Sequence, residues 1–322
     1  MPIGTQPKGA TVDRVPINSP FRYAGGKFYA RKLILEQMIP HSYYAEPFAG
    51  GGSIFFAKSK AATNLLNDAD PELVNCYIHI RDHVEELIAL LDGIGASKEN
   101  HTYYKNVYRP TNELERAFRW YYLNRTSYSG IMNAPNCYWG YGDIYSMQPK
   151  NWPGHLRRCS AKLQDVQITC ADFAQTIEQA PDGAFLFVDP PYFNADQDKF
   201  YTYSFTRADH LRLAEVLHTH SHRLSFLLTY DNSPEVRALY QWAAAMLDKE
   251  WNYTINRTDD QTKKTTDRGK RYMGREVFIL SYDPAAVAHQ PVAVQLPLVG
   301  FPADLAVASS GRRSAEQPVS AG

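Results

Sequence analysis

The sequence predicts an α/β fold, in which a mostly parallel sheet with helices on both faces is interrupted by an inserted, mainly helical domain. Short apolar runs alternate with helical patterns over residues 19–74 and 164–284, which is the order of strand–helix–strand units. Between residues 74 and 163 this alternation gives way to helices and then to a stretch rich in Asn, Gly, Pro and aromatic residues. We therefore expect a sheet domain from 19–74 and 164–284, with a second domain at 75–163.

The individual elements follow from local patterns. An apolar run at 43–48 leads through a glycine turn into a helix near 53–60, and a second run at 64–66 completes a βαβ opening. A later helix is expected at 207–220, because Thr206 and Asp209 have the spacing of a capping box. The remaining expected strands are 166–170, 184–189, 224–230, 251–256 and 277–282.

Bulk composition predicts a globular protein of the cytoplasm. The chain has 322 residues, of which 44% are hydrophobic, and this is enough to bury a large core. No apolar run of about 18 residues and no signal-peptide pattern are present, so neither a membrane span nor export is expected. Residues 1–18 and 285–322 lack periodicity and are expected to be disordered.

The cysteines do not form a recognisable metal or disulfide pattern. They are few and widely spaced, without a C-x-x-C pair, so we expect buried thiols in a reducing compartment and neither a zinc site nor disulfides. The residues concerned are Cys76, Cys137, Cys159 and Cys170.

Net charge by itself argues against a polyanionic partner, because 34 basic residues balance 34 acidic ones. The charges are, however, unevenly distributed along the chain. Between Arg257 and Arg275 there are seven basic and three acidic residues, a local net charge of +4. This segment could follow a phosphate backbone, or it could be a solvated loop. Its candidate phosphate contacts are Lys263, Lys264, Arg268, Lys270 and Arg271.

The turn after the first strand is the first chemical motif. In AEPFAGGGS (45–53), Gly50, Gly51 and Gly52 separate a strand from a helix, so backbone amides and the positive end of the helix could face a ligand. A dinucleotide site or a plain tight turn would use the same pattern. Asp68, at the end of the next strand, could accept hydrogen bonds from ribose hydroxyls, which favours an adenosine-bearing ligand. The alternative is that Asp68 caps the helix that starts at Pro71.

The second motif, VDPPYF (188–193), directly follows an apolar strand at the edge where open α/β sheets bind ligands. The amine of adenine is a poor nucleophile because its lone pair is delocalised into the ring. Two acceptors, the Asp189 carboxylate and the Pro190 carbonyl, would draw that nitrogen toward a tetrahedral state. Tyr192 would stack on a base flipped out of the duplex, and Pro191 completes the motif. In isolation the motif could also be a turn.

These motifs together resemble the Dam-like, D12 class of DNA adenine N6-methyltransferases, over residues 21–282. The resemblance implies a Rossmann-like methyltransferase sheet with an inserted target-recognition domain. It further implies methyl transfer from S-adenosylmethionine to an adenine in double-stranded DNA, without a metal. The segments that carry it are FRYAGGK (21–27), AEPFAGGGS (45–53), NDAD (67–70), YLNRTSYSG (122–130), ADF (171–173) and DPPY (189–192).

By the same resemblance, Tyr23 packs on the cofactor and Lys27 contacts its methionine carboxylate. Asp68 holds the ribose, and Asp172 or Phe173 reads the cofactor adenine. Physically, Lys27 supplies a compact cation for a zwitterionic ligand beside an open glycine backbone. The remaining expected cofactor residues come from the two motifs and are Glu46, Pro47, Phe48, Gly50, Gly52 and Asp189.

In the inserted domain, Asn124, Arg125 and Tyr128 match the family segment that approaches DNA, and residues 131–150 correspond to its DNA-reading hairpin. Here the chain departs from the GATC methylases, because aromatic and amide side chains accompany the single cation Lys150 where those enzymes carry several arginines. The aromatics could stack on bases or could form the core of this domain. They are Tyr138, Trp139, Tyr141 and Tyr145.

Other functions remain open on the residues alone. N4-cytosine or RNA methylation poses the same chemical problem of a ring-conjugated amine. A nicotinamide oxidoreductase would leave the DPPY motif unexplained, and a non-catalytic DNA-binding regulator would not need it. Beyond DNA, a cognate restriction endonuclease or another defence protein is a candidate partner, and DNA binding would place the protein at the nucleoid.

Overall fold

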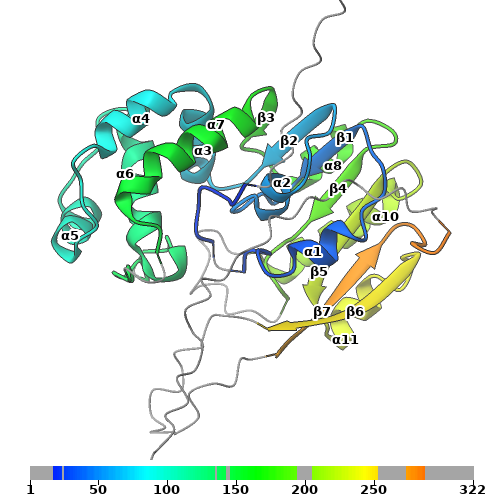
Figure 1. The fold of residues 1–322 in the computed structure, drawn as a ribbon. Coiled ribbons are helices and arrows are strands. Elements are labelled where there is room, and N and C mark those ends of the chain that lie inside the picture. The colour runs from blue at the N-terminus through cyan, green and yellow to red at the C-terminus, as the bar shows by residue number, and fades with distance from the viewer. Residues whose placement is uncertain are drawn as a thin grey trace, which may run out of the picture.

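The computed structural model describes residues 17–23, 25–134, 136–142, 146–193, 205–252 and 273–286 (Figure 1). The segments expected to be disordered fall outside these ranges, except for the residues at their inner ends. At one of these, Ile17 is buried and its amide donates to the Phe56 carbonyl. The expected phosphate contacts at 263–271 also lie outside the described residues. Within the described ranges, no helix combines the length and apolar character needed to cross a membrane.

A seven-stranded sheet with the order β3-β2-β1-β4-β5-β7-β6 forms the centre of the fold. The first five strands in this order are parallel, and β7 runs antiparallel to both of its neighbours. The expected mostly parallel α/β sheet is therefore confirmed. The strands are β1 Tyr43–Glu46, β2 Thr63–Asn67, β3 Val166–Thr169, β4 Phe185–Val188, β5 Ser225–Asp231, β6 Ala245–Asn252 and β7 Met273–Leu280.

The edge strand β6 corrects one predicted boundary. A strand was expected at 251–256, but β6 starts at Ala245 and pairs with β7 through to Asn252. Its middle, Asp248–Lys249–Glu250, is charged, and this hides the alternation by which buried strands are recognised. Charged side chains are common on edge strands because they discourage pairing with another chain.

Helices cover both faces of the sheet, as expected (Figure 1). On one face, α8, α10 and α11 pack against apolar side chains of β4, β5 and β7. On the other, α1, α2, α3, α6 and α7 share a second core with β1, β4 and β5. The helices around the sheet are α1 Arg31–Leu35, α2 Ser53–Ala57, α8 Phe173–Gln179, α10 Arg207–His220 and α11 Pro234–Leu239. The capping box of Thr206 and Asp209 at the start of α10 is confirmed.

Residues 71–163 fold as a group of helices beside β2 and β3, and two short 3-10 turns interrupt them (Figure 1). Trp120 and Trp152 of this group are buried in the same core as Phe187 of the sheet, so the helices pack directly on the sheet domain. The elements are α3 Pro71–Asp82, α4 Val84–Leu91, α5 Lys98–Asn106, α6 Glu113–Thr126, η1 Tyr128–Gly130, η2 Pro149–Asn151 and α7 Trp152–Leu163.

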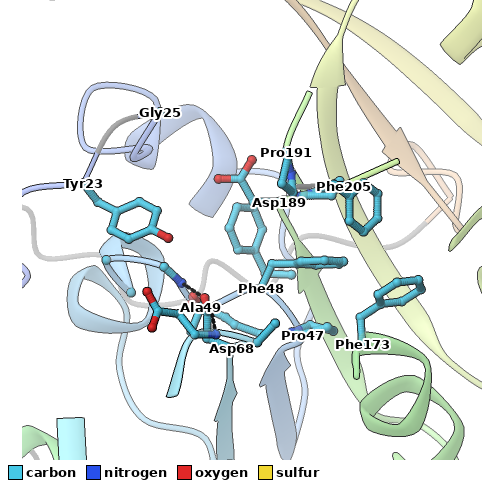
Figure 2. Close-up of a pocket in the computed structure, with 18 of the residues that line it drawn as sticks. Tyr23, Gly25, Pro47, Phe48, Ala49, Asp68, Phe173, Asp189, Pro191 and Phe205 are labelled. Atoms are coloured by element: carbon cyan, nitrogen blue, oxygen red, sulfur yellow. Dashed lines mark hydrogen bonds between the residues drawn. The ribbon is translucent and has the colours of Figure 1, made fainter. Parts of the chain in front are cut away.

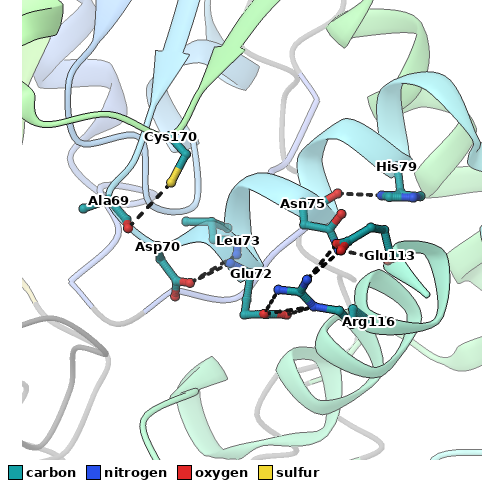
Figure 3. A network of polar contacts seen from close by, with 9 residues as sticks. All are labelled: Ala69, Asp70, Glu72, Leu73, Asn75, His79, Glu113, Arg116 and Cys170. Atoms are coloured by element: carbon teal, nitrogen blue, oxygen red, sulfur yellow. Dashed lines mark hydrogen bonds and ion pairs between the residues drawn. The ribbon is translucent and has the colours of Figure 1, made fainter. Parts of the chain in front are cut away.

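A polar network ties the loop after β2 to this helical group (Figure 3). Asp70 caps α3 by accepting from the amides of Glu72 and Leu73. Glu72 pairs with Arg116 of α6, which also pairs with Glu113 at 2.7 Å. Helix α3 starts at the carboxyl edge of the sheet and packs on α6. It therefore fixes the position of α6 relative to the sheet.

The expectation for the cysteines is only partly correct. Cys76, Cys137 and Cys159 are buried free thiols, as expected. Cys170, however, is exposed, because it follows β3 at the open carboxyl edge of the sheet, where side chains meet solvent.

The two leucines at positions 211 and 213 of α10 provide a matched test of this packing. Leu213 is fully buried against the sheet, whereas Leu211 is 50% exposed. We expect Leu213→Ala to lower the free energy of unfolding by about 2–5 kcal/mol, because it leaves a cavity in the core. Leu211→Ala should change it by less than ~1 kcal/mol. Urea denaturation of both variants measures this difference, and equal losses would contradict the described packing.

Candidate functional site

A cavity of about 260 Å³ opens at the carboxyl ends of β1, β2 and β4. In Figure 2, Tyr23 and Asp68 lie on one side of it and the rings of Phe48, Phe173 and Phe205 on the other. All the residues expected to bind a cofactor line this cavity, so segments far apart in the chain meet there. They are Tyr23, Lys27, Glu46, Pro47, Phe48, Gly50, Gly52, Asp68, Asp172, Phe173 and Asp189, accompanied by Pro190 and Pro191.

The glycine turn differs from the expected cradle of free amides. The Gly50 amide donates to Asp68 at 2.8 Å, and the Gly52 amide donates to the Ala49 carbonyl. The glycines are needed for conformation and space instead, since Gly50 has φ +47° and Gly52 has φ +64°. A Cβ at Gly50 would lie 2.8 Å from the Tyr23 ring. The turn therefore lets the backbone approach Tyr23 closely, and two of its amides, those of Gly50 and Gly52, already have acceptors within the protein.

Asp68 supports the turn and does not cap the following helix. One carboxylate oxygen accepts from Gly50 and the other from the Asp70 amide at 3.0 Å. The cap of α3 is Asp70, so the alternative that Asp68 is the N-cap is wrong. Burial raises the pKa of Asp68 to about 6, against the opposing effect of the amide hydrogen bonds.

Glu46 forms the floor of the cavity at the end of β1. Its Oε1 accepts from the Tyr44 hydroxyl at 2.7 Å and from the Phe55 amide at 2.8 Å, which binds α2 to the strand. The side chain is buried, and this raises its pKa to about 8, although Lys58 nearby acts in the opposite direction. A largely protonated carboxyl group therefore lies beneath the site at neutral pH.

A buried ion pair joins the N-terminal segment to the DPPY motif. The Lys27 ammonium lies 2.6 Å and 2.8 Å from the two oxygens of Asp189, and its side chain is only 4% exposed. It also donates to the Gly25 carbonyl and lies 4.8 Å from the centre of the Tyr192 ring. Thr229 on β5 donates to Asp189 Oδ1 at 2.7 Å. The Asp189 carboxylate is thus oriented by two donors, Lys27 from the N-terminal segment and Thr229 from β5.

The opposite end of the cavity is aromatic and closed by an ion pair. The rings of Phe48 and Phe173 stack with centres 5.3 Å apart, and Phe205 packs on both. Asp172 caps α8 and pairs with Arg212 of α10, which lowers the pKa of the carboxyl. The Arg212 guanidinium lies 4.2 Å from the centre of the Phe173 ring. A flat apolar ligand with hydrogen-bond donors at its edge fits this end.

Among the residues that shape the site and were not predicted are Phe205, Arg212 and Thr229. Phe205 and Arg212 come from the start of α10, and they reach the cavity only because α10 packs beside α8. Thr229 lies inside an apolar strand, where a threonine is unremarkable in the sequence. No local motif distinguishes any of the three, so their roles depend on tertiary contacts.

The residues expected to approach DNA have different surroundings. Asn124 is fully buried, where it accepts from the Arg22 amide and donates to the Arg22 and Gly130 carbonyls. Arg125 is 6% exposed and Tyr128 is 38% exposed. Asn124 therefore fastens the segment before Tyr23 to the helical group. Direct contact of Asn124 with DNA stays a prediction. Of the three residues expected to approach DNA, Tyr128 is the most exposed.

Comparison with known proteins identifies relatives of this chain. Residues 23–255 match the family described as D12 class N6 adenine-specific DNA methyltransferase. The Type II methyltransferase M1.LlaDCHI of Lactococcus lactis subsp. cremoris is 29% identical over 288 residues, covering 81% of this chain and 94% of that protein. The DNA adenine methylase of Serratia marcescens is 25% identical, covering 69% of this chain and 87% of that protein.

Two further matches are partial or distant. The DNA N-6-adenine-methyltransferase of Escherichia phage P1 is 30% identical over 68% of this chain, which spans only 30% of that protein. Among solved structures, precorrin-6y C5,15-methyltransferase of Geobacter metallireducens GS-15 aligns over 84% of this chain and 98% of that one, with 10% identity and a TM-score of 0.36. The sheet described above and the family match agree with the expected Rossmann-like methyltransferase fold.

The raised pKa of Glu46 predicts a pH-dependent stability. The protonated carboxyl favours the folded state fully below its ordinary pKa of 4.5, and this contribution is lost as pH rises through about 8. Glu46→Gln stays neutral and keeps one acceptor oxygen for Tyr44 and Phe55. Its stability relative to the unmodified protein should therefore improve between pH 5 and pH 8 by roughly 1–3 kcal/mol. Denaturant titrations at both pH values measure this change, with exposed Glu235→Gln as the control. An unchanged difference would contradict the assigned protonation.

Proposed function

Because this chain belongs to the D12 class of N6 adenine-specific DNA methyltransferases, we propose that its cavity binds the methyl donor S-adenosylmethionine and that Asp189 faces the target amine. The chain is a DNA adenine methyltransferase by family. The observation that supports this site most strongly is the Lys27–Asp189 ion pair, which connects the cofactor cavity to the DPPY motif. A nicotinamide oxidoreductase is inconsistent with the family.

The cavity suits an adenosine with a zwitterionic tail. The stacked rings of Phe48 and Phe173 suit a purine, and the Asp172 carboxylate beside them suits an exocyclic amine. Asp68 at the cavity wall suits the ribose hydroxyls, and the glycine turn and Tyr23 line the same cavity, where the methionine chain on the sulfur must also fit. When bound, S-adenosylmethionine supplies an electrophilic methyl group on a sulfonium.

Asp189 and Pro190 act on the adenine amine as acceptors. A carboxylate has lone pairs for more than one donor, so Asp189 can accept from the target amine while Thr229 and Lys27 hold it in place. With the Pro190 carbonyl as second acceptor, the nitrogen lone pair is withdrawn from the ring and becomes nucleophilic. A strong base is unnecessary, because methylation would break the S–CH3 bond, release S-adenosylhomocysteine and acidify the remaining N–H, whose proton would then pass to solvent.

The target adenine must leave the base stack to reach Asp189. We assign Tyr192 to stack on the flipped base, which offsets part of the unstacking cost of a few kcal/mol. The Tyr192 ring is contacted by the Lys27 ammonium and by Tyr230, whose ring centre lies 6.1 Å away. A ring fixed in this way loses little further entropy when a base stacks on it.

The helical group of 71–163 is assigned to target recognition on double-stranded DNA. Tyr128 and Tyr138 are 38% and 60% exposed there, and the Lys105 ammonium lies 5.4 Å from the centre of the Tyr138 ring. Exposed aromatic side chains beside a cation suit contact with bases and phosphates. The basic residues between 263 and 271 remain candidate phosphate contacts. A Type II relative makes a cognate restriction endonuclease a candidate partner, and cytoplasmic, nucleoid-associated action is the proposed setting.

The catalytic assignment predicts the effect of Asp189→Ala. We expect a loss of at least ~10²-fold in the rate of methyl transfer, because an interaction strengthened in the transition state is removed, while cofactor affinity survives. Transfer of labelled methyl from S-adenosylmethionine to unmethylated genomic DNA, followed by nucleoside mass spectrometry, measures the rate and identifies N6-methyladenine. Asp182→Ala, at a side chain that is 86% exposed, is the control. Normal turnover by Asp189→Ala would refute the mechanism, and N4-methylcytosine would reassign the target.

The glycine turn predicts a selective defect in cofactor binding. Gly50→Ala places a Cβ 2.8 Å from the Tyr23 ring at a left-handed φ of +47°. Gly183→Ala meets comparable backbone strain at φ +77°, but nothing lies within 4 Å of its Cβ. We expect Gly50→Ala to weaken S-adenosylmethionine binding about tenfold or more in isothermal titration calorimetry, and Gly183→Ala to leave it unchanged. Equal affinities would exclude a cofactor contact at this turn.

A further inference from the structure

A third carboxyl group lies beneath the DPPY motif, on the antiparallel strand β7. Glu276 is directly opposite Asp231 of β5 in the strand register, and it is 1% exposed. Directly opposed residues of an antiparallel pair have Cβ atoms only ~4.5–5.5 Å apart, so two carboxylates there would repel each other. Asp231 accepts a hydrogen bond from the Phe193 amide at 2.9 Å, whereas Glu276 is the more deeply buried of the two acids. Burial disfavours the charged form, so we assign the proton to Glu276.

The groups that face Glu276 support this assignment. Burial raises the pKa of Glu276 to about 8, and the negative charges of Asp189 and Asp231 act in the same direction. Lys27 and Tyr192 act in the opposite direction and reduce the shift. From the outer side, Lys249 of β6 is the register partner of Glu276 and lies over the Phe278 ring.

Glu276 also lies near the aromatic residue of the motif. The Tyr192 hydroxyl and both carboxyl oxygens of Glu276 are buried, and the hydroxyl lowers the pKa of the Glu276 carboxyl group. The Tyr192 ring is contacted by the Lys27 ammonium and by Tyr230. Lys27 and Tyr230 thus contact the ring from separate segments, and Glu276 is the buried acid that acts on its hydroxyl.

We propose that Glu276 is a positioning residue for methyl transfer, which holds the Tyr192 phenol so that its ring meets the flipped adenine beside Asp189. This inference rests on the proposed roles of Asp189 and Tyr192. The protonated acid accepts from Tyr192 without adding charge next to Asp189. Ionised Glu276 places a second negative charge near Asp189 and competes for Lys27, which disturbs the carboxylate that receives the target amine.

The proposal predicts an alkaline loss of activity that a neutral side chain removes. With a pKa of about 8, the protonated fraction of Glu276 falls roughly tenfold between pH 7 and pH 9. The single-turnover rate of methyl transfer should fall by the same factor. Glu276→Gln keeps the shape and the acceptor, so its rate should fall at least fivefold less over this range. Exposed Glu235→Gln should follow the unmodified enzyme.

Removal of the acceptor tests the contact with Tyr192. At pH 7, Glu276→Ala should slow single-turnover transfer about tenfold, the size expected for one positioning hydrogen bond, with S-adenosylmethionine affinity unchanged. In a Tyr192→Phe background, which lacks the hydroxyl, Glu276→Ala should have less than a twofold further effect. Glu276→Gln should restore most of the rate in the Tyr192 enzyme. Circular dichroism and cofactor affinity report whether each variant is folded.

Each outcome separates this proposal from the catalytic assignment. If Glu276→Gln shows the same alkaline loss as the unmodified enzyme, or if the Glu276→Ala effect persists in full without the Tyr192 hydroxyl, the positioning role is overturned while Asp189 keeps its own. Unimpaired transfer by Asp189→Ala in the same assay would overturn the assigned chemistry, and the role of Glu276 with it.

Discussion

The buried ion pair between Lys27 and Asp189 is the interaction on which the rest of the site depends. The Lys27 side chain is only 4% exposed, so its charge needs a close counterion, and the pair joins the segment around Gly25 to the end of β4. This segment forms one wall of the cavity and brings an ammonium group to the Tyr192 ring. The Asp189 carboxylate is thus oriented by a side chain that also lines the cavity. In the proposed function, Lys27 lies between the cofactor and the carboxylate that accepts from the target amine.

The parallel sheet provides the second constraint. Carboxyl ends of parallel strands meet at one edge, so Glu46, Asp68 and Asp189 converge although they end different strands. Antiparallel β7 then adds a carboxyl from the other chain direction, and this places Glu276 beneath the motif. Burial raises the pKa values of Glu46 and Glu276, and the nearby Asp189 acts in the same direction on both. The site thus combines the paired carboxylate of Asp189 with two acids whose pKa is raised.

Much of the fold and cavity could be predicted, and the failures have identifiable physical causes. The order of strands and helices followed from periodicity, and the expected cofactor residues all line one cavity. The edge strand β6 was placed too late because its charged middle hides the alternation. Phe205, Arg212 and Thr229 carry no local signal, since their roles arise from helix packing and strand register. The hydrogen bonds by which buried Asn124 fastens Arg22 could not be predicted either, because its partner lies 102 residues away in the chain.

The sequence by itself determined the chemistry available to this protein: the glycine turn, the acid after β2, the DPPY motif and their order along the chain. These features are local, because a few adjacent residues suffice for a turn or an acceptor pair. Only the tertiary structure decided which groups share protons and charges. Lys27 meets Asp189 across 162 residues, and Glu276 faces Asp231 through strand register. Pairing and pKa depend on distance and burial in space, and neither quantity is set by neighbours in the chain.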